Sequence, residues 1–491
     1  MDKLIFPDPK EGICLVRSSP GKAGFPLGIR LSPSDPFARK VLAELGLPYH
    51  RSVIKLNQCS RNFSNNKVGP NVLYLSENQG GFPRHGLAIL EGKEVREFPN
   101  LNYVDLVLDE KSLADGELSI YSHELGHVMM MNIWESFPER ESVKQHVSMG
   151  VTDYSLAFSE GWGEHFQRLA YEGIPAYQKN FQDGFGYKRY ARSLWHSSID
   201  EELRIDGVVQ NTYVWQKVMP LEDLSSFGPE QLVLLEHTSP VFNRTRLKNG
   251  QQMLSCEGVL ATLFYRLDSN PVLRNNYVES TFYERFLLSP IPPGLKPQDI
   301  FSPFENVFLK NFWVWSQIKD KVGAGKVLFL EFLKEWSRAF PQDREEIWNV
   351  FISTTVGKTL SDEPGRLYEQ AALYGMIGDY QRFLPASGNF KKSLAEWTAK
   401  DLSGAVEADA NLGPEIWIEN KDFQIRTTLW SEEEKKPLRI NLNTCSRYDL
   451  MTFPGIDPDR ARKIIETREK MGFFRSLDEA KKSGFDPGHG L

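Results

Sequence analysis

The chain has 491 residues, of which 41% are hydrophobic and 25% are charged, and its formal net charge is -7. This length exceeds one ordinary core, so we expect two or three domains, and the composition excludes a disordered or fibrous protein. The negative charge gives no general reason to expect binding to nucleic acids or to anionic membranes.

Targeting signals are absent from the sequence as it stands. No stretch approaches the ~18 consecutive apolar residues of a membrane helix, so no membrane partner is expected. The first residues, MDKLIFPDPKEG, lack the basic and apolar regions of a signal peptide. We therefore expect a cytoplasmic protein if Met1 is the native start, and an extracytoplasmic one if the chain is a trimmed form. The four cysteines are far apart, which favours free thiols over a disulfide framework.

The first part of the chain, residues 1–95, is predicted to consist of strands and loops. Short β-favouring runs such as residues 71–76 alternate with Gly, Pro, Ser and Asn. Residues 103–108 (YVDLVL) predict a further strand, which would form an edge where an extended peptide can pair.

Helices are expected to dominate the rest of the chain. The first should cover residues 116–134, and a second, over residues 153–171, should be broken by Gly161 and Gly163. Beyond residue 255, apolar residues recur at helical spacing, in the segments 259–267, 308–318, 327–340 and 367–383.

The predicted fold class is α+β, with a strand-rich N-terminal part, a two-lobed catalytic part and a small helical C-terminal module. Residues 413–430 contain a strand-like stretch, and the charged run at 431–437 resembles a linker. The predicted boundaries, in chain order, are 1–95, 96–405, 406–434 and 435–491.

The strongest chemical signal is the motif HELGH at residues 123–127. On a helix, residues four apart project from one face, so His123 and His127 can bind one ion together. Neutral imidazoles suit Zn²⁺, which keeps one position open in catalytic sites. Glu124 follows the first ligand and can reach a water molecule at that open position without binding the metal itself.

A third ligand has to come from elsewhere in the chain. Position 133, where some HExxH proteins carry a third histidine, is isoleucine. Glu160 lies 33 residues after His127 in the stretch FSEGWGEHF and is the predicted third ligand. Glu164 follows one turn later and could accept a hydrogen bond from His123, which would fix the tautomer of that imidazole.

HELGH followed about thirty residues later by SEGWGEHF is similar to the gluzincin metallopeptidases, including the thermolysin-like clan, over roughly residues 100–170. The resemblance implies zinc, hydrolysis of a peptide or protein substrate, and a two-lobed fold with the metal helix at the floor of a cleft. Position 164 departs mildly from the thermolysin-like pattern, because it carries glutamate where aspartate is common.

Gluzincins also use a tyrosine or histidine from a downstream segment to stabilise the developing oxyanion. Five residues in this chain are candidates, and the sequence does not choose between them. Tyr213 and His196 are slightly favoured over the others, which are Tyr187, Tyr190 and Tyr265.

The last fifty residues carry a second pattern. The stretch from LRINLNTCSRYDL through FPGIDPDRARKII to MGFFRSL resembles the helix-hairpin-helix domain of ComEA-type competence proteins. The resemblance implies DNA binding, in which hairpin backbone amides meet phosphate. Gly455, Arg460 and Lys463 are the predicted contacts.

The charge of the tail agrees in part with DNA binding. Residues 435–491 hold twelve Lys or Arg and eight Asp or Glu. Asp457 replaces the second glycine of the expected P-G-I-G turn, and its carboxylate would repel phosphate. Such modules also bind proteins or pack as structural units, so both uses remain open.

Two function hypotheses follow. The favoured one is a zinc metallopeptidase with a helix-hairpin-helix appendage, which DNA or a protein could localise. The alternative is a DNA-tethered binding protein that keeps an inactive metalloprotease-like scaffold.

Overall fold

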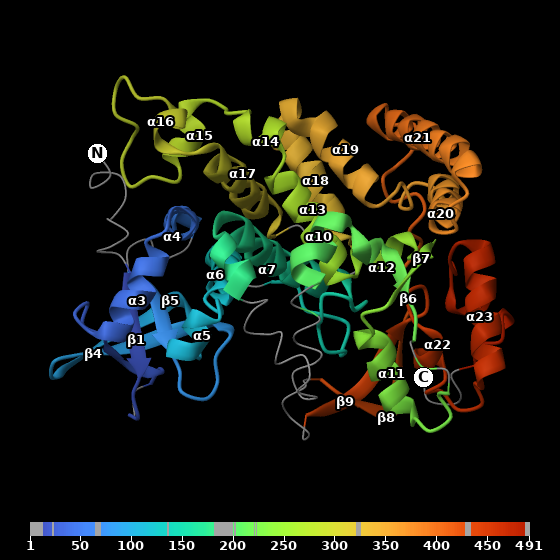
Figure 1. Ribbon diagram of the computed structural model, residues 1–491, viewed down its shortest axis with the longest axis horizontal. Helices are drawn as coiled ribbons and strands as arrows, with labels where there is room; N and C mark the ends of the chain where they lie inside the picture. The colour runs from blue at the N-terminus through green and yellow to red at the C-terminus, as the bar shows by residue number, and fades with distance from the viewer. Residues whose placement is uncertain are drawn as a thin grey trace.

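The computed structural model describes residues 13–21, 24–63, 70–134, 137–180, 200, 203–219, 221, 223–320, 326–427 and 434–486. The fold is mixed α and β. Three parts follow one another in Figure 1: a barrel (residues 13–106), a helical body (110–402) and a C-terminal module (417–486). No helix within the described residues combines the length and apolar character needed to cross a membrane.

The barrel is a closed five-stranded sheet in the order β1-β2-β4-β5-β3. Helices α3 (Pro36–Leu45) and α4 (Pro48–Ser60) follow β2. The predicted strand near residue 71 is confirmed as β3. The strands are β1 (Ile13–Ser18), β2 (Leu27–Arg30), β3 (Asn71–Leu75), β4 (Phe82–Glu91) and β5 (Glu94–Leu106).

The strand predicted near residue 103 forms the end of β5, but it is not an edge. Val104 pairs with Leu73 of β3 on one side and with Pro83 of β4 on the other. Its backbone is thus used within the sheet, so the predicted pairing with an extended peptide at this strand is wrong. Closure of the barrel is the physical reason, because a closed sheet has no free edge.

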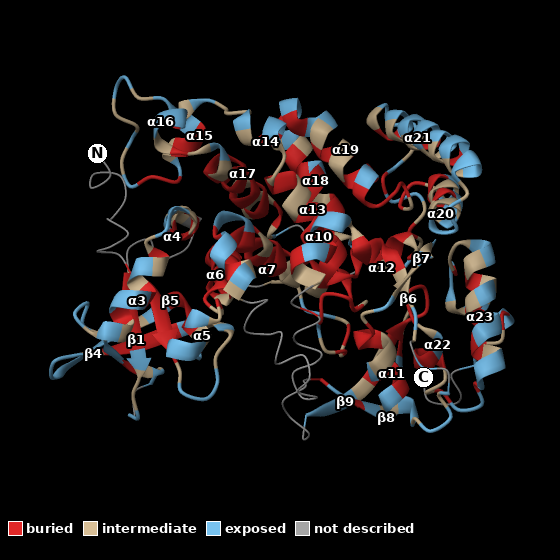
Figure 2. Cartoon of the chain, in the orientation of Figure 1, coloured by how far each residue is buried: buried red, intermediate tan, exposed pale blue. Residues whose placement is uncertain are grey.

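Helix α6 (Ser119–Ile133) runs through the interior of the molecule. It follows the short helix α5 (Glu110–Ala114), and nearly all of its residues are buried. Figure 2 shows α6 and α7 as largely buried elements between the barrel and the other helices. A helix enclosed on all sides needs mostly uncharged residues around its circumference, and apart from His123, Glu124 and His127 this helix has no ionisable side chain except Tyr121.

Helix α7 (Tyr154–Gly173) is continuous, so the predicted break at its glycines is wrong. Gly161 allows close helix packing: a Cβ atom there would lie 2.6 Å from Cβ of Leu260 in α13 (Glu257–Asp268). The absence of a side chain therefore serves contact between helices rather than a turn.

The helical prediction beyond residue 255 is confirmed, with one difference. The segment predicted as a helix over 367–383 is two helices, because the chain turns at Gly378, whose φ is +73°. The main helices there are α12 (Gly250–Leu254), α14 (Pro271–Asn275), α15 (Ser280–Glu284), α16 (Pro297–Ile300), α17 (Pro303–Ile318), α18 (Leu328–Ala339), α19 (Arg344–Thr354), α20 (Asp362–Met376) and α21 (Tyr380–Leu402).

The middle of the body contains shorter elements. Strands β6 (Trp215–Lys217) and β7 (Phe242–Leu247) form a two-stranded sheet, with α11 (Pro229–Thr238) between them in sequence. They are preceded by a π-helix (Leu203–Gly207), α10 (Val208–Gln210) and a 3-10 turn (Thr212–Val214).

The C-terminal module contains a hairpin of β8 (Trp417–Arg426) and β9 (Lys435–Asn441), followed by three helices. The helices are α22 (Arg447–Leu450), α23 (Pro458–Met471) and α24 (Leu477–Lys482). They share an apolar cluster with the two strands. The pairing of β8 with β9 crosses the boundary predicted at residue 434, so the strand-like segment and the helices pack together.

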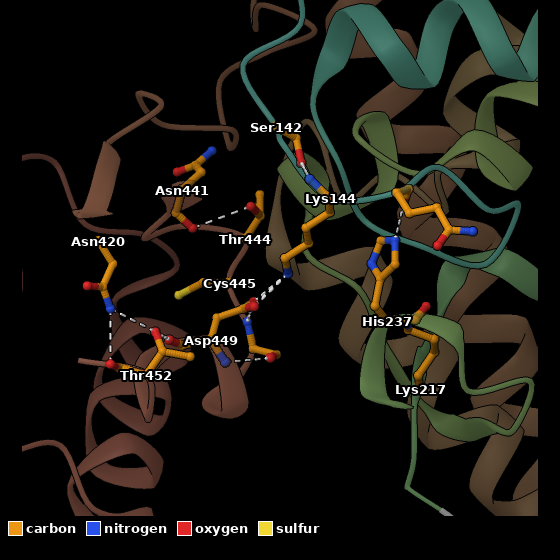
Figure 3. A network of polar contacts seen from close by, with 12 residues as sticks. Ser142, Lys144, Lys217, His237, Asn420, Asn441, Thr444, Cys445, Asp449 and Thr452 are labelled. Carbon is orange, nitrogen blue, oxygen red and sulfur yellow. Dashed lines mark hydrogen bonds and ion pairs between the residues drawn. The ribbon is translucent and has the colours of Figure 1, made fainter. Parts of the chain in front are cut away.

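The module is docked against the body through buried polar contacts. The Lys144 ammonium group contacts the Asp449 carboxylate at 2.7 Å, and their side chains are only 11% and 1% exposed. Asn249 Nδ2 donates a hydrogen bond to the main-chain oxygen of Asn443 at 2.8 Å. Figure 3 shows Lys144 reaching from the body towards Asp449 of α22. Contacts of this kind bind two parts of a chain in one orientation.

Candidate metal centre

The three predicted metal ligands converge where α7 packs along α6. Nε2 of His123 and Nε2 of His127 lie 3.1 Å apart. Oε2 of Glu160 lies 3.6 Å from the first nitrogen and 3.4 Å from the second. Among the residues that the structure describes, this trio is the one group of His, Cys, Asp or Glu side chains whose ligand atoms gather within 4.8 Å.

The protonation states of His123 and Glu160 suit a cation, whereas the imidazole of His127 would have to lose its proton to a bound ion. Burial lowers the pKa of His123 to about 3, so this imidazole is neutral at pH 7. Burial would raise the pKa of Glu160, but His146 and His127 hold it well below its usual value. Burial lowers the pKa of His127, and Glu160 more than offsets this effect. Two imidazoles and a carboxylate are a ligand set that Zn²⁺ accepts.

Gly163 keeps space open beside the imidazoles. A Cβ atom at this position would lie 2.8 Å from Nε2 of His123 and 2.8 Å from Nε2 of His127. Because α7 faces α6 here, any larger residue would occupy the volume between the ligand atoms. The residues present therefore fit a bound metal ion both in chemistry and in space.

Glu124 is nearly enclosed, with 7% of its surface exposed. Burial raises the pKa of its carboxyl group to about 7. A carboxyl group whose pKa is close to neutrality can both accept and return a proton at physiological pH, as a general base and acid must. This position agrees with the role predicted from its place in the motif.

His146, which no sequence pattern singles out, also lies close to the candidate ligands. Its Nδ1 is 3.5 Å from Oε2 of Glu160 and 3.7 Å from Oε2 of Glu257, and its side chain is 44% exposed. The negative charge of Glu160 raises the pKa of His146 to about 10. Burial acts against this rise, and the negative charge of Glu257 adds to it. His146 belongs to the segment between α6 and α7, where no periodic pattern places a side chain, so sequence spacing could not reveal it.

Glu164 lies beyond the ligands, in a fully buried position. Its Oε1 is 3.4 Å from Nε of Arg204. The Nδ1 atom of His123 has no hydrogen bond among the described residues. The expected hydrogen bond from His123 to Glu164 is therefore not formed, and Glu164 is paired with arginine instead.

Of the two favoured oxyanion candidates, Tyr213 lies within the described residues and His196 does not. Tyr213 is fully buried, and a Cβ atom added at Gly258 would come within 2.4 Å of its ring. Burial and the nearby Glu164 carboxylate raise the pKa of Tyr213 well above its usual value. His196 lies outside the described residues.

Other side chains of the types that bind metals are buried in the core, away from the three candidate ligands. His165 is buried, and its Nε2 lies 2.8 Å from Oδ2 of Asp268. All four cysteines are buried free thiols, as predicted.

The three residues predicted to contact nucleic acid surround the turn between α22 and α23. Gly455 is exposed and has φ of +74°. Lys463 is exposed, whereas Arg460 donates to the main-chain oxygens of Gly455 at 2.9 Å and of Gly484 at 2.6 Å. Asp457 caps α23 by accepting a hydrogen bond from the Arg460 amide, which explains why aspartate replaces glycine in the turn.

Comparison with known proteins identifies the C-terminal module. Residues 436–487 match the family model of the helix-hairpin-helix motif. No match to a peptidase family was found. No curated protein and no solved structure matches the chain. The helix-hairpin-helix motif is consistent with nucleic-acid binding.

Proposed function

We propose that this chain is a zinc-dependent metallopeptidase that hydrolyses peptide bonds in peptide or protein substrates. The observation that carries the proposal is the convergence of His123, His127 and Glu160 with Glu124 beside them. A gluzincin-like catalytic part, with lobes on both sides of the metal helix, would accompany this function.

The chemistry divides between the metal and the protein. When bound, zinc would polarise the substrate carbonyl and make water more acidic. The Glu124 carboxylate takes a proton as water attacks, and then gives a proton to the leaving amine. His123, His127 and Glu160 hold the ion, and Gly163 leaves the space that it needs.

The first test is cleavage of a peptide library, followed by mass spectrometry, with the wild type and Glu124→Gln. The wild type should cleave, and the variant should lose at least about 100-fold in rate because it lacks the general base. Zinc content, measured by elemental analysis, should remain near one ion per chain in both proteins, because Glu124 is not a ligand.

The outcome can contradict the proposal in two ways. Equal cleavage by both proteins would remove Glu124 from the reaction and point to a contaminating peptidase. Loss of zinc binding in His123→Ala and His127→Ala, but no cleavage by the zinc-loaded wild type, would favour the inactive scaffold.

Nucleic-acid binding by the C-terminal module is a second candidate function. The family match of residues 436–487 favours it, together with the exposed Gly455 turn and Lys463. DNA bound by this module would place the peptidase next to DNA-bound protein substrates.

Duplex DNA titrated into the full chain and followed by fluorescence anisotropy tests this second function. Affinity should fall steeply between 50 and 200 mM salt, as expected when phosphate contacts release counterions. Lys463→Ala should reduce the salt slope by about 1, whereas Lys392→Ala, an exposed lysine on α21 of the body, should not. Binding that does not depend on salt or on Lys463 would argue against DNA and for protein docking.

A further inference from the structure

A cavity of about 400 Å³ lies where the C-terminal module meets the body. The body contributes residues near β6, α11 and β7, and the module contributes residues of α22, α23 and the segment before them. Figure 3 shows part of its walls, with Lys217 and His237 from the body and Cys445 and Asp449 from the module. The walls of the cavity are therefore complete only when the two parts are docked.

Three buried or partly buried cationic side chains on these walls contact no carboxylate among the described residues. Lys248 and Arg468 are 2% and 3% exposed, and Lys217 is partly exposed. Within the described residues, no acidic group lies within 4.0 Å of the charged nitrogens of these three side chains. Their oxygen partners are main-chain carbonyls, of His237 for Lys217, of Tyr213 and Trp215 for Lys248, and of Leu442 and Cys445 for Arg468.

The remaining charges around the cavity do not balance these cations. Lys144 is paired with Asp449, and Arg246 is paired with Glu469. Among the acidic residues that line the cavity, Glu236 forms no ion pair within the described residues. Buried cations without a counterion are costly, and carbonyl dipoles offset only part of that cost.

Two further observations indicate that negative charge is missing from the cavity. Burial lowers the pKa of Lys217 to about 8, and the positive charges of Lys248 and Lys144 act in the same direction. The negative charge of Glu236 offsets only part of this effect. Nε of Arg468 is buried and has no hydrogen-bond partner among the described residues. A guanidinium donor without a partner, on the walls of a cavity that two ammonium groups also line, is an arrangement suited to a phosphate group.

We propose that this junction cavity binds a small phosphate-class anion, either inorganic phosphate or a phosphomonoester, through Lys217, Lys248 and Arg468. The volume exceeds that of phosphate alone, so an organic group attached to the phosphate can enter as well. Because Lys217 and Lys248 come from the body and Arg468 from the module, the anion would connect the two parts. It would stabilise the docked form in proportion to its concentration.

Isothermal titration of the full chain with inorganic phosphate, at constant ionic strength, tests the proposal. Glycerol phosphate and succinate serve as parallel ligands. Phosphate and glycerol phosphate should bind, and succinate should bind at least about 10-fold more weakly, because its charges lie at opposite ends of the molecule, whereas a phosphate gathers its charge and acceptor oxygens on one tetrahedral centre. Equal binding of succinate would overturn the assignment to phosphate, and no binding of any ligand would overturn the site.

Variants with opposite expected effects locate the binding. Lys217→Met should weaken phosphate binding about 10-fold by removing one charge-assisted contact, and Glu236→Gln should tighten it by removing the opposing negative charge. Lys482→Met, which changes an exposed lysine at the end of α24, should leave the affinity unchanged. If Lys217→Met does not fold, Glu236→Gln still decides. Unaltered affinity in Glu236→Gln, or lost affinity in Lys482→Met, would place the anion elsewhere and refute the proposal.

Discussion

Gly163 faces the two imidazoles of α6. Substitution at this position is therefore a direct test of whether a metal ion binds between them. In Gly163→Ala, the added Cβ would lie 2.8 Å from both Nε2 atoms. Zinc affinity, measured by chelator competition, should fall on the order of 100-fold, as when the support of a ligand is disturbed. Gly388→Ala in α21 is the matched control, because nothing lies within 4 Å of a Cβ placed there.

The control should keep its zinc and gain up to about 1 kcal/mol of stability, because alanine favours helix over glycine. Unchanged zinc affinity in Gly163→Ala would show that the ion, if bound, lies away from these imidazoles.

His146 contacts the third ligand from the exposed side of the centre. In His146→Gln, Glu160 loses the imidazole that lies 3.5 Å from its carboxylate. We expect activity or zinc affinity to fall about 10–100-fold, as for other groups that support a ligand. Peptide hydrolysis and zinc titration on the same samples would separate the two effects.

His85→Gln is the control for this prediction, because His85 lies in the barrel, hydrogen-bonded to Asn102. If both histidine variants behave alike, His146 has no special role.

At the scale of single residues, the sequence predicted that the candidate ligands come together, because helical spacing places two of them on one face. His123 and His127 are four residues apart on one helix, so their proximity needs no tertiary information. Glu160 required a resemblance between motifs. His146 and Arg204 could not be predicted, because tertiary packing brings them to the centre from outside the two helices.

At the scale of secondary-structure elements, Glu415 lies two residues before β8, in surroundings that disfavour the charged form of its carboxyl group. Burial and the nearby Asp153 carboxylate raise the pKa of Glu415 to about 7. In the unfolded chain the same group ionises near 4.5, so the folded state binds more protons between these values. Folding stability should therefore decrease as pH rises from about 4.5 to 7, by at most about 3 kcal/mol from this group.

Glu415→Gln removes that penalty. Urea unfolding should show the variant to be more stable than the wild type at pH 8 and similar to it at pH 4.5. Glu419→Gln, an exposed change in the same strand, should not alter the pH dependence. A difference between Glu415→Gln and the wild type that is constant across pH would contradict this origin.

Local pattern was sufficient to predict most helices but not how the elements meet. The aromatic residues of α17 and α18, such as Trp315 and Trp336, are buried, as expected of apolar residues that recur at helical spacing. The closure of the barrel around β5 and the continuity of α7 through its glycines depend on neighbours that are distant in sequence. Glycine is ambiguous for this reason: it breaks isolated helices but also permits close packing between helices.

For the whole molecule, the Lys144 and Asp449 pair is the main buried charge contact between the body and the module. Lys144→Met would leave a buried carboxylate without its cation, which costs about 3–5 kcal/mol. Amide hydrogen exchange of the full chain should show faster exchange in α22 and α23, because a module that is poorly docked opens more often.

Lys144→Met combined with Asp449→Asn should recover much of that loss, because no unpaired charge remains. Similar exchange in the wild type and in Lys144→Met would show that the module is held by its other contacts. The charged run before β9 suggested a solvated linker, and only the tertiary structure reveals that β8 pairs across it.

The same ion pair can form only late in the synthesis of the chain, because its two residues are far apart in sequence. Asp449 follows Lys144 by 305 residues. At about 5–20 residues per second, a ribosome adds Asp449 about 15–60 s after Lys144. During that interval the nascent chain already contains His123, His127 and Glu160, but the segment that carries both Lys144 and His146 lacks its final anchor. The surroundings of the candidate metal centre are therefore among the last parts of the molecule to mature, long after the candidate ligands themselves have been translated.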